Sequence, residues 1–191
     1  DVDFEFWPEI SFDGRTIAYE SLKNFSQGHN SNSSILLKGV GSADKPRLLI
    51  KEAQRVKWSP KEDKLAVMKN LGGALSLWVV NGLGEASKLV EGNLNPISSS
   101  ILPHNRAQAN DYDWSPDGNR LVYGLSRNGQ SNLWVTAADG SSNAQATWHN
   151  DPDLSVYNPF WASDGRRLAY LSRKSARAET GENFSNTAWL A

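Results

Sequence analysis

The chain has 191 residues, of which 39% are hydrophobic and 21% are charged, and its formal net charge is −1. This composition is that of a globular protein and excludes a disordered or fibrous chain. A net charge near zero argues against nucleic acid as the partner, because nucleic-acid-binding domains carry a basic patch. The sequence contains no apolar run of 18 residues, so no membrane span is predicted. It also contains no cysteine, which excludes disulfide bonds and catalysis by a thiol.

The first half of the chain reads as two sets of four short strands separated by turns. The first set, residues 6–50, comprises Phe6–Ser11, Thr16–Ser21, Ser33–Lys38 and Pro46–Ile50. The second set, residues 54–90, comprises Gln54–Ser59, Lys64–Lys69, Ala74–Val80 and Ala86–Val90. In its first turn, Glu62 stands where the other sets have Gly. That turn is therefore either strained by about 1 kcal/mol or shifted in position.

The second half of the chain repeats the pattern. The third set, residues 112–147, comprises Tyr112–Ser115, Arg120–Ser126, Asn132–Ala137 and Asn143–Thr147. Its strands are separated by turn signals such as Asn128-Gly129 and Asp139-Gly140. The fourth set, residues 157–191, comprises Tyr157–Ala162, Arg167–Ser172 and Asn186–Leu190. This last set lacks a fourth strand, and we expect it to be incomplete.

The four sets are copies of one unit. The aligned residues Ile10, Trp58, Trp114 and Trp161 start the copies 48, 56 and 47 residues apart. Four strands per unit at this period are typical of a β-propeller, so the sequence predicts an all-β fold of about four blades. Six of the eight Trp fall at repeat positions, which indicates packing between blades. Because an open sheet edge is unfavourable, we expect a larger ring, closed by further blades or by a second copy.

The long segments are predicted to lie at one end of the blades. In an antiparallel blade, the loop after the second strand and the connector to the next blade share an end. The segments concerned are Lys23–Asn32, Glu91–Asn110, Trp148–Val156 and Arg173–Ser185. Insertions in repeat proteins collect on one face, which is often the binding face. We call this end of each blade the loop-bearing end.

The sequence contains no recognisable catalytic or metal-binding motif. The three histidines, His29, His104 and His149, fall in separate long segments without metal-ligand spacing and are interpreted as solvated. Four aspartates cluster near the same end but match no calcium loop, and we expect them to start turns; they are Asp111, Asp113, Asp151 and Asp153. No G-x-S-x-G or H-E-x-x-H motif appears. We therefore predict no catalytic residue, bound metal or cofactor.

The third copy resembles the repeat of TolB-type propellers. The resemblance is carried by the stretch from Trp114 to Gly118, by Leu121-Val122-Tyr123 and by Leu133-Trp134-Val135. It implies a bacterial protein in the periplasm or another extracytoplasmic compartment. In that family the repeat serves partner-binding periplasmic proteins, sensing domains of membrane-anchored regulators, and the non-catalytic propellers of prolyl-oligopeptidase-like serine peptidases.

The leading hypothesis is a non-enzymatic module that binds or senses a protein or peptide at the loop-bearing end. The residues expected to contact the partner are His104, Arg106, Tyr112, Asp153 and Tyr157. Packing within the blade is an equally open interpretation of each. The alternative function is a propeller domain of a larger enzyme. That enzyme would be a serine peptidase with its catalytic domain outside this chain, or a metal-dependent propeller lyase.

Overall fold

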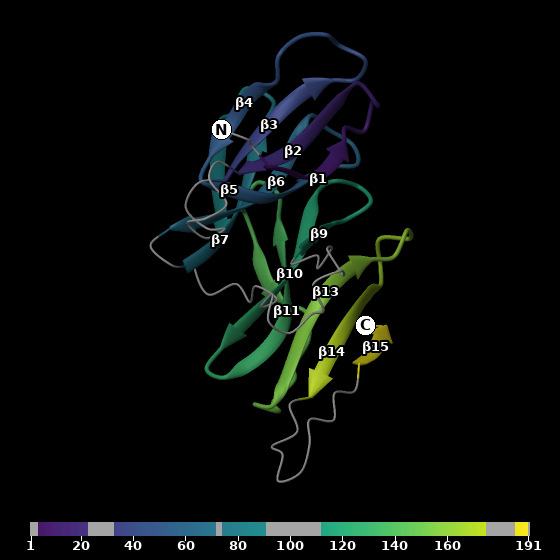
Figure 1. Ribbon diagram of the computed structural model, residues 1–191. Coiled ribbons are helices and arrows are strands. Elements are labelled where there is room, and N and C mark those ends of the chain that lie inside the picture. Colours follow the sequence, from purple (N-terminus) through teal and green to yellow (C-terminus); the bar gives the residue numbers. More distant parts are fainter. Residues whose placement is uncertain (1–3, 23–32, 72–73, 91–111, 175–185, 191) are drawn as a thin grey trace. The chain divides into compact units, whose positions relative to one another are not determined.

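The structure is a computed structural model that describes residues 4–22, 33–71, 74–90, 112–174 and 186–190. These residues form strands and turns (Figure 1), and no helix suited to crossing a bilayer is found in this part of the chain. The chain divides into two compact units, Asp1–Gly92 and Asn93–Ala191, which we call unit 1 and unit 2. The predicted all-β fold is confirmed.

Unit 1 contains two four-stranded antiparallel sheets, called blade 1 and blade 2. Blade 1 consists of β1 (Phe4–Ile10), β2 (Thr16–Leu22), β3 (Ser33–Gly39) and β4 (Arg47–Lys51). Blade 2 consists of β5 (Ala53–Trp58), β6 (Lys64–Leu71), β7 (Ala74–Asn81) and β8 (Ala86–Val90). Each strand pairs with its neighbour in sequence, so each blade is a succession of hairpins.

Unit 2 contains blade 3 and blade 4. Blade 3 consists of β9 (Tyr112–Trp114), β10 (Arg120–Arg127), β11 (Gln130–Ala137) and β12 (Asn143–Gln145). In the described residues, blade 4 has three strands, β13 (Leu154–Trp161), β14 (Leu168–Lys174) and β15 (Asn186–Leu190). β13 begins earlier than predicted. Leu154–Val156 was expected in a connector but pairs with the end of β14, and Val156 N–H also donates to Ser131 Oγ at 2.9 Å.

Each unit has a core between its two blades. In unit 1, buried side chains from blade 1, such as Ile35 and Leu49, meet buried side chains of blade 2, such as Leu65 and Trp58. In unit 2, Val122 and Leu133 of blade 3 meet a buried group from blade 4 that comprises Val156, Leu168 and Tyr170. Burial of these faces is the main force that holds the paired blades together, because the hydrophobic effect scales with the apolar area removed from water.

The repeated tryptophans take part in this packing. Trp58 belongs to the core of unit 1, and its indole N–H donates to the Glu9 carbonyl of blade 1 at 3.2 Å. Trp78 packs against the same core, and Trp161 packs against the core of unit 2. The Arg120 guanidinium of blade 3 lies 4.6 Å from the centre of the Trp161 ring. The packing interpretation is confirmed for these three residues.

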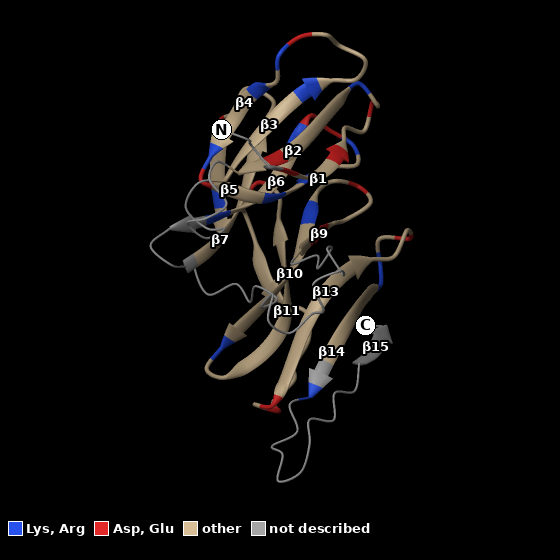
Figure 2. Cartoon of the chain, in the orientation of Figure 1, with Lys and Arg blue, Asp and Glu red and all other residues tan. Residues whose placement is uncertain are grey.

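Charge is concentrated at the strand ends of unit 2. Figure 2 shows the bodies of β10, β11 and β13 nearly free of charged residues, and the sequences of β11 and β13 contain none.

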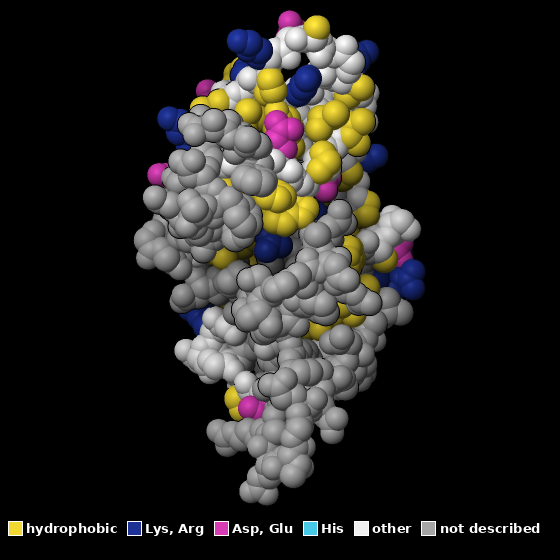
Figure 3. All heavy atoms as spheres, in the orientation of Figure 1, with side chains coloured by type: hydrophobic (Ala, Val, Ile, Leu, Met, Phe, Trp, Pro, Cys, Tyr) yellow, Lys and Arg dark blue, Asp and Glu magenta, His cyan; other side chains and the backbone are white. Residues whose placement is uncertain are grey.

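Unit 1 exposes several large hydrophobic side chains, some of which are visible in Figure 3. Among its described residues, the exposed large hydrophobic ones are Ile10, Phe12, Val40, Leu48 and Leu83. Three of these, Phe12, Val40 and Leu83, lie in the short turns opposite the loop-bearing end.

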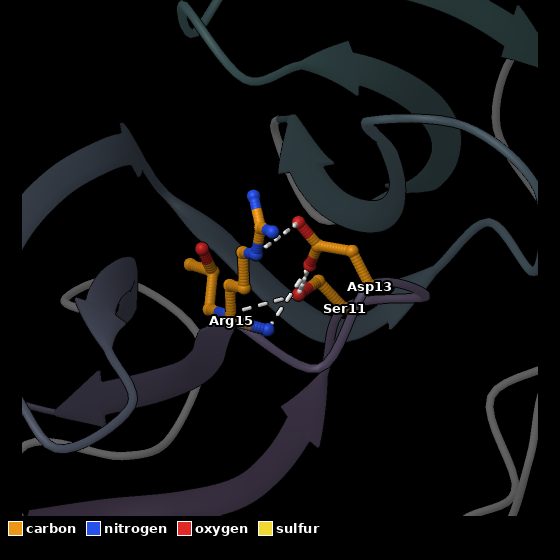
Figure 4. A network of polar contacts seen from close by, with 4 residues as sticks. Ser11, Asp13 and Arg15 are labelled. Atoms are coloured by element: carbon orange, nitrogen blue, oxygen red, sulfur yellow. Dashed lines mark hydrogen bonds and ion pairs between the residues drawn. The ribbon is translucent and has the colours of Figure 1, made fainter.

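The Ser-x-Asp-Gly segment after the first strand is a hydrogen-bonded turn. In blade 1, Ser11 Oγ donates to Asp13 Oδ1 at 2.6 Å and accepts the Thr16 N–H at 2.9 Å (Figure 4). Asp13 Oδ1 also accepts the Arg15 N–H, and Gly14 takes a φ of +72°. Blade 3 repeats the arrangement, with Ser115 Oγ donating to Asp117 Oδ1 at 2.5 Å. The most recognisable repeat motif therefore stabilises turns.

Blade 2 closes its first turn differently. Glu62 is not among the described residues with positive φ. Ser59 Oγ instead accepts the N–H groups of both Lys61 and Glu62 at 3.3 Å, and the Lys64 N–H donates to the Glu62 carbonyl at 2.8 Å. Of the two alternatives for this turn, the shifted one is confirmed.

Replacing Asp13 and Asp117 together with Asn should lower the melting temperature at pH 7, and the difference from the wild type should shrink as the pH falls below about 4. The hydroxyls of Ser11 and Ser115 are the main cause that lowers the pKa of each carboxyl, followed by backbone N–H groups. A lowered folded-state pKa gives stability that is present above the unfolded pKa of about 4 and lost as the pH falls through the folded value. Thermal unfolding of both proteins from pH 7 to pH 3 measures the difference, and a constant difference would contradict this role.

Candidate functional site at the connector of unit 2

One of the long predicted segments lies fully within the described residues. It is the connector between blades 3 and 4, residues 146–153, which joins β12 to β13. It lies at the same end as the start of β11 and the end of β14, as its contacts with Asn132 and Lys174 show. The turns after the first and third strands of these blades lie at the opposite end, where the Ala138 N–H donates to the Asn119 carbonyl and the Arg120 guanidinium donates to the Gly165 carbonyl. Within unit 2, the loop-bearing end is therefore distinct from the turn-bearing end.

Asn132 fastens this connector to blade 3. Its side chain is 4% exposed on β11, and Oδ1 accepts the His149 N–H at 2.6 Å and the Thr147 hydroxyl at 3.1 Å. The Asn132 amide donates back to the His149 carbonyl at 3.0 Å. Thr147 Oγ1 in turn accepts the Leu133 N–H at 2.9 Å. Buried polar groups that are fully bonded in this way fix the local backbone.

Trp148 stands between the two fastened residues and is 76% exposed. Exposing so large an apolar side chain is unfavourable, and exposed Trp is typical of binding surfaces. Because Thr147 and His149 are both held by Asn132, the backbone of Trp148 is fixed before any partner arrives. A rigid aromatic anchor loses little entropy on binding, which favours affinity.

Blade 4 holds the rest of the connector. His149 Nε2 lies 3.0 Å from the Tyr170 hydroxyl, and burial raises the pKa of Tyr170. Lys174 Nζ lies 2.7 Å from Asp151 Oδ2, and this bond lowers the pKa of Asp151 and raises that of Lys174. The Asp153 N–H donates to Asp151 Oδ1 at 3.0 Å. The connector is thus attached to both blades of unit 2.

The predicted contact residues fall in different environments. Asp153 lies half-buried on the connector, and Tyr157 lies half-buried in β13. Tyr112 begins β9 as predicted but is only 2% exposed, so its ring is enclosed within unit 2. His104 and Arg106 lie outside the described residues. Of the five, Asp153 is therefore the one seen on the connector with Trp148.

The aspartates and histidines considered as metal ligands have other contacts where the structure describes them. Asp113 Oδ2 accepts the Trp161 N–H at 3.0 Å, so this carboxylate bridges blades 3 and 4. Asp151 is paired with Lys174, while Asp111, His29 and His104 lie outside the described residues. Within the described ranges, no group of three or more His, Asp or Glu is arranged to hold a metal ion.

The first strands contain a second feature that the sequence does not reveal. β1, β5 and β13 each contain a bulge with a non-glycine residue at positive φ, namely Trp7 at +47°, Arg55 at +57° and Asn158 at +50°. In unit 1, the Arg55 guanidinium lies 5.4 Å from the centre of the Trp7 ring, and its backbone N–H donates to the buried Glu20. Bulges redirect side chains. In these three blades the bulge presents three different residue types, Trp, Arg and Asn.

Sequence reasoning missed both Trp148 and Trp7 as candidates. The available signal was the repeat itself, because they are the two tryptophans that do not occupy repeat positions. A repeated Trp is explained by packing between blades, whereas an additional one needs another explanation.

Comparison with known proteins supports the fold. No protein-family model matches the chain, and a search of curated proteins also found no match. Among solved structures, TolB from Acinetobacter baumannii matches 97% of this chain with a TM-score of 0.65 and 14% identity, over 41% of its own chain. The propeller domain of the Trilobed protease from Pyrococcus furiosus matches 98%, with a TM-score of 0.61 and 14% identity, over 54% of its chain.

A Pyrococcus horikoshii acylaminoacyl peptidase matches 98% of this chain with a TM-score of 0.60 and 13% identity, over 31% of its chain. The chain therefore spans about half or less of each of these proteins. Identities this low show the fold alone. The repeated blades and these likenesses together establish that the chain has the fold of a TolB-like β-propeller.

Proposed function

We propose that this chain is a non-enzymatic module that binds or senses a protein or peptide through the loop-bearing end of its blades. The observation that carries the proposal is Trp148, which is exposed between two residues hydrogen-bonded to the buried Asn132. The cost of exposing this aromatic ring is offset when a partner covers it. The resemblance to TolB-type repeats supports an extracytoplasmic location, which cell fractionation would test.

A selection experiment tests the proposal. A library of random 12-residue peptides is displayed against the immobilised chain, and the affinity of each enriched peptide is then measured by calorimetry. Replacing Trp148 with Ala should weaken binding by about 30-fold or more if it acts as a hot spot. The fold should not change, because the side chain makes no hydrogen bond or ring contact in the described residues.

Phe12→Ala is the matched control, since Phe12 is an exposed aromatic residue in a short turn of unit 1. It should leave the affinity unchanged. Peptides that bind Trp148→Ala as tightly as the wild type, or that lose affinity in Phe12→Ala instead, would place binding elsewhere. Failure to enrich any peptide would also count against a binding module.

A second candidate function is a propeller domain of a larger peptidase. The likeness to the propeller of the Trilobed protease and to an acylaminoacyl peptidase favours it, since both match 98% of the chain. In that case the partner of the blades would be a catalytic domain of the same protein. The complete reading frame decides between the two, because a downstream hydrolase domain would favour the peptidase.

A further inference from the structure

The sequence contains two Asn-Gly steps, and both lie in turns between strands. Asn128-Gly129 joins β10 to β11, and Asn81-Gly82 begins the turn from β7 to β8. An Asn-Gly step can lose the Asn side-chain amide without an enzyme, because the backbone nitrogen of Gly, which has no side chain to hinder it, can attack the side-chain carbonyl carbon of Asn. The rate in a folded protein depends on how firmly the fold holds that side chain.

The fold holds Asn81 firmly. Its Oδ1 accepts the N–H groups of Leu83 and Glu85, both at 3.0 Å, and its Nδ2 donates to Glu85 Oε2 at 2.7 Å. The next residue is also fixed, because the Gly82 carbonyl accepts the Arg47 guanidinium at 2.7 Å. The side chain of Asn81 must give up these three hydrogen bonds before its carbonyl carbon can turn towards the Gly82 nitrogen.

Asn128 has no such restraint. It is exposed, and its side chain makes no hydrogen bond or ion pair within the part of the chain that the structure describes. Nothing lies within 4 Å of the position that a Cβ on Gly129 would take. The pair of residues next to this tip, Arg127 and Gln130, is the last of the β10–β11 ladder. Such ends open locally at low cost. Opening lets Asn128 leave its φ of +54° and bring its side-chain carbonyl carbon to the Gly129 nitrogen.

We propose that Asn128 is a site of spontaneous deamidation. The Gly129 nitrogen forms a bond to the Asn128 side-chain carbonyl carbon and loses its proton, and the side-chain nitrogen leaves as ammonia. Water then opens the resulting cyclic imide at either of its carbonyls, which gives aspartate or isoaspartate. In sum, an amide and a water molecule become a carboxylate and an ammonium ion. This proposal goes beyond the proposed function and does not depend on it.

The modified residue would lie at the loop-bearing end of blade 3. The β10–β11 tip precedes the start of β11, where Asn132 contacts the connector through the His149 carbonyl. Each conversion adds one negative charge beside Arg127. Aspartate tolerates a positive φ, so it can keep the tight turn. Isoaspartate lengthens the backbone and does not fit a two-residue loop.

Ageing the folded chain at mildly alkaline pH tests the proposal. Samples are digested at acidic pH, where little further deamidation occurs, and mass spectrometry of the peptides measures the conversion of each Asn. Asn128 should convert at least about tenfold faster than Asn81, because Asn81 must first give up its hydrogen bonds. Asn128→Asp provides the reference for the aspartate product, and a methyltransferase specific for isoaspartate labels the isomer.

The matched control is the same chain unfolded in guanidinium chloride. There both Asn-Gly steps are free of the fold, and their rates should be similar. The proposal is overturned if Asn128 stays intact in the folded chain while the unfolded chain converts. It is also overturned if Asn81 or another described Asn converts first, or if the ratio of the two rates is the same in the folded and unfolded chains.

Discussion

Replacing Leu65 with Ala should lower the free energy of unfolding by about 2–5 kcal/mol. Leu65 is 0% exposed and lies in the core between blades 1 and 2. Truncation removes apolar contacts and leaves a cavity that the two sheets can close only by moving together, since their strands are fixed by ladder hydrogen bonds. Denaturant unfolding followed by circular dichroism gives the difference.

Leu83→Ala is the matched control for this substitution. Leu83 is 83% exposed in the β7–β8 turn of the same blade, so its removal should change stability by less than about 0.5 kcal/mol. Leu65→Met, which nearly conserves volume, should cost less than about 1.5 kcal/mol. Equal losses from Leu65→Ala and Leu83→Ala would show that the two blades do not share a core.

Replacing Gly84 with Ala should be nearly as destabilising, at about 2–4 kcal/mol. Gly84 has a φ of +90° in the β7–β8 turn, and a Cβ there would lie 2.9 Å from the Leu49 carbonyl oxygen of blade 1. The carbonyl oxygen belongs to the backbone of a paired strand, so it cannot move away by a change of rotamer as a side chain could. The neighbouring contact from Arg47 to the Gly82 carbonyl, at 2.7 Å, holds the same strand against the same turn.

Gly41→Ala separates the two causes of that loss. Gly41 also has a positive φ, of +71°, but nothing lies within 4 Å of the position that a Cβ would take. It should therefore cost only the conformational penalty of about 1–2 kcal/mol. If Gly84→Ala and Gly41→Ala destabilise the protein equally in thermal unfolding, the close contact between blades 1 and 2 is absent.

The repeat made most of the fold predictable from the sequence. Turn residues at fixed offsets, such as Ser115-Pro116-Asp117-Gly118, mark where the first strand ends, because Gly permits the positive φ that the turn needs. The apolar runs between turns then predict the strands, and their recurrence predicts the propeller. Asn128-Gly129, both at positive φ, likewise gives the tight hairpin between β10 and β11.

The bulges of the first strands could not be predicted in the same way. Trp7, Arg55 and Asn158 adopt positive φ although none is Gly, so no residue type marks the position. The hydrogen bonds to the neighbouring strand hold each of these residues at positive φ. The bulge can therefore be recognised only from the register of the whole strand pair. The early start of β13 also depends on residues distant in sequence, because Val156 pairs with Ser172 of β14 and its N–H donates to Ser131 of blade 3.

The candidate site was predictable only in part. Strand direction alone indicates which segments share the loop-bearing end, and it places Asp153 there. The sequence places Trp148 in a connector and indicates no role for it, because the backbone on both sides of it is held by Asn132, which lies 16 residues earlier on β11. For Tyr112, the structure favours packing within the blade over contact with a partner. An aromatic residue that opens a strand can equally face the core, and this one is 2% exposed.

Hydrogen–deuterium exchange on the chain bound to a selected peptide is the most direct test of binding at the loop-bearing end. The expected result is slower amide exchange in the connector, residues 146–153, with unchanged exchange in the turns that follow the first and third strands of each blade. Protection confined to those turns, above all around Phe12, Val40 and Leu83, would contradict the account. In that case the exposed apolar residues of unit 1 would be the binding surface.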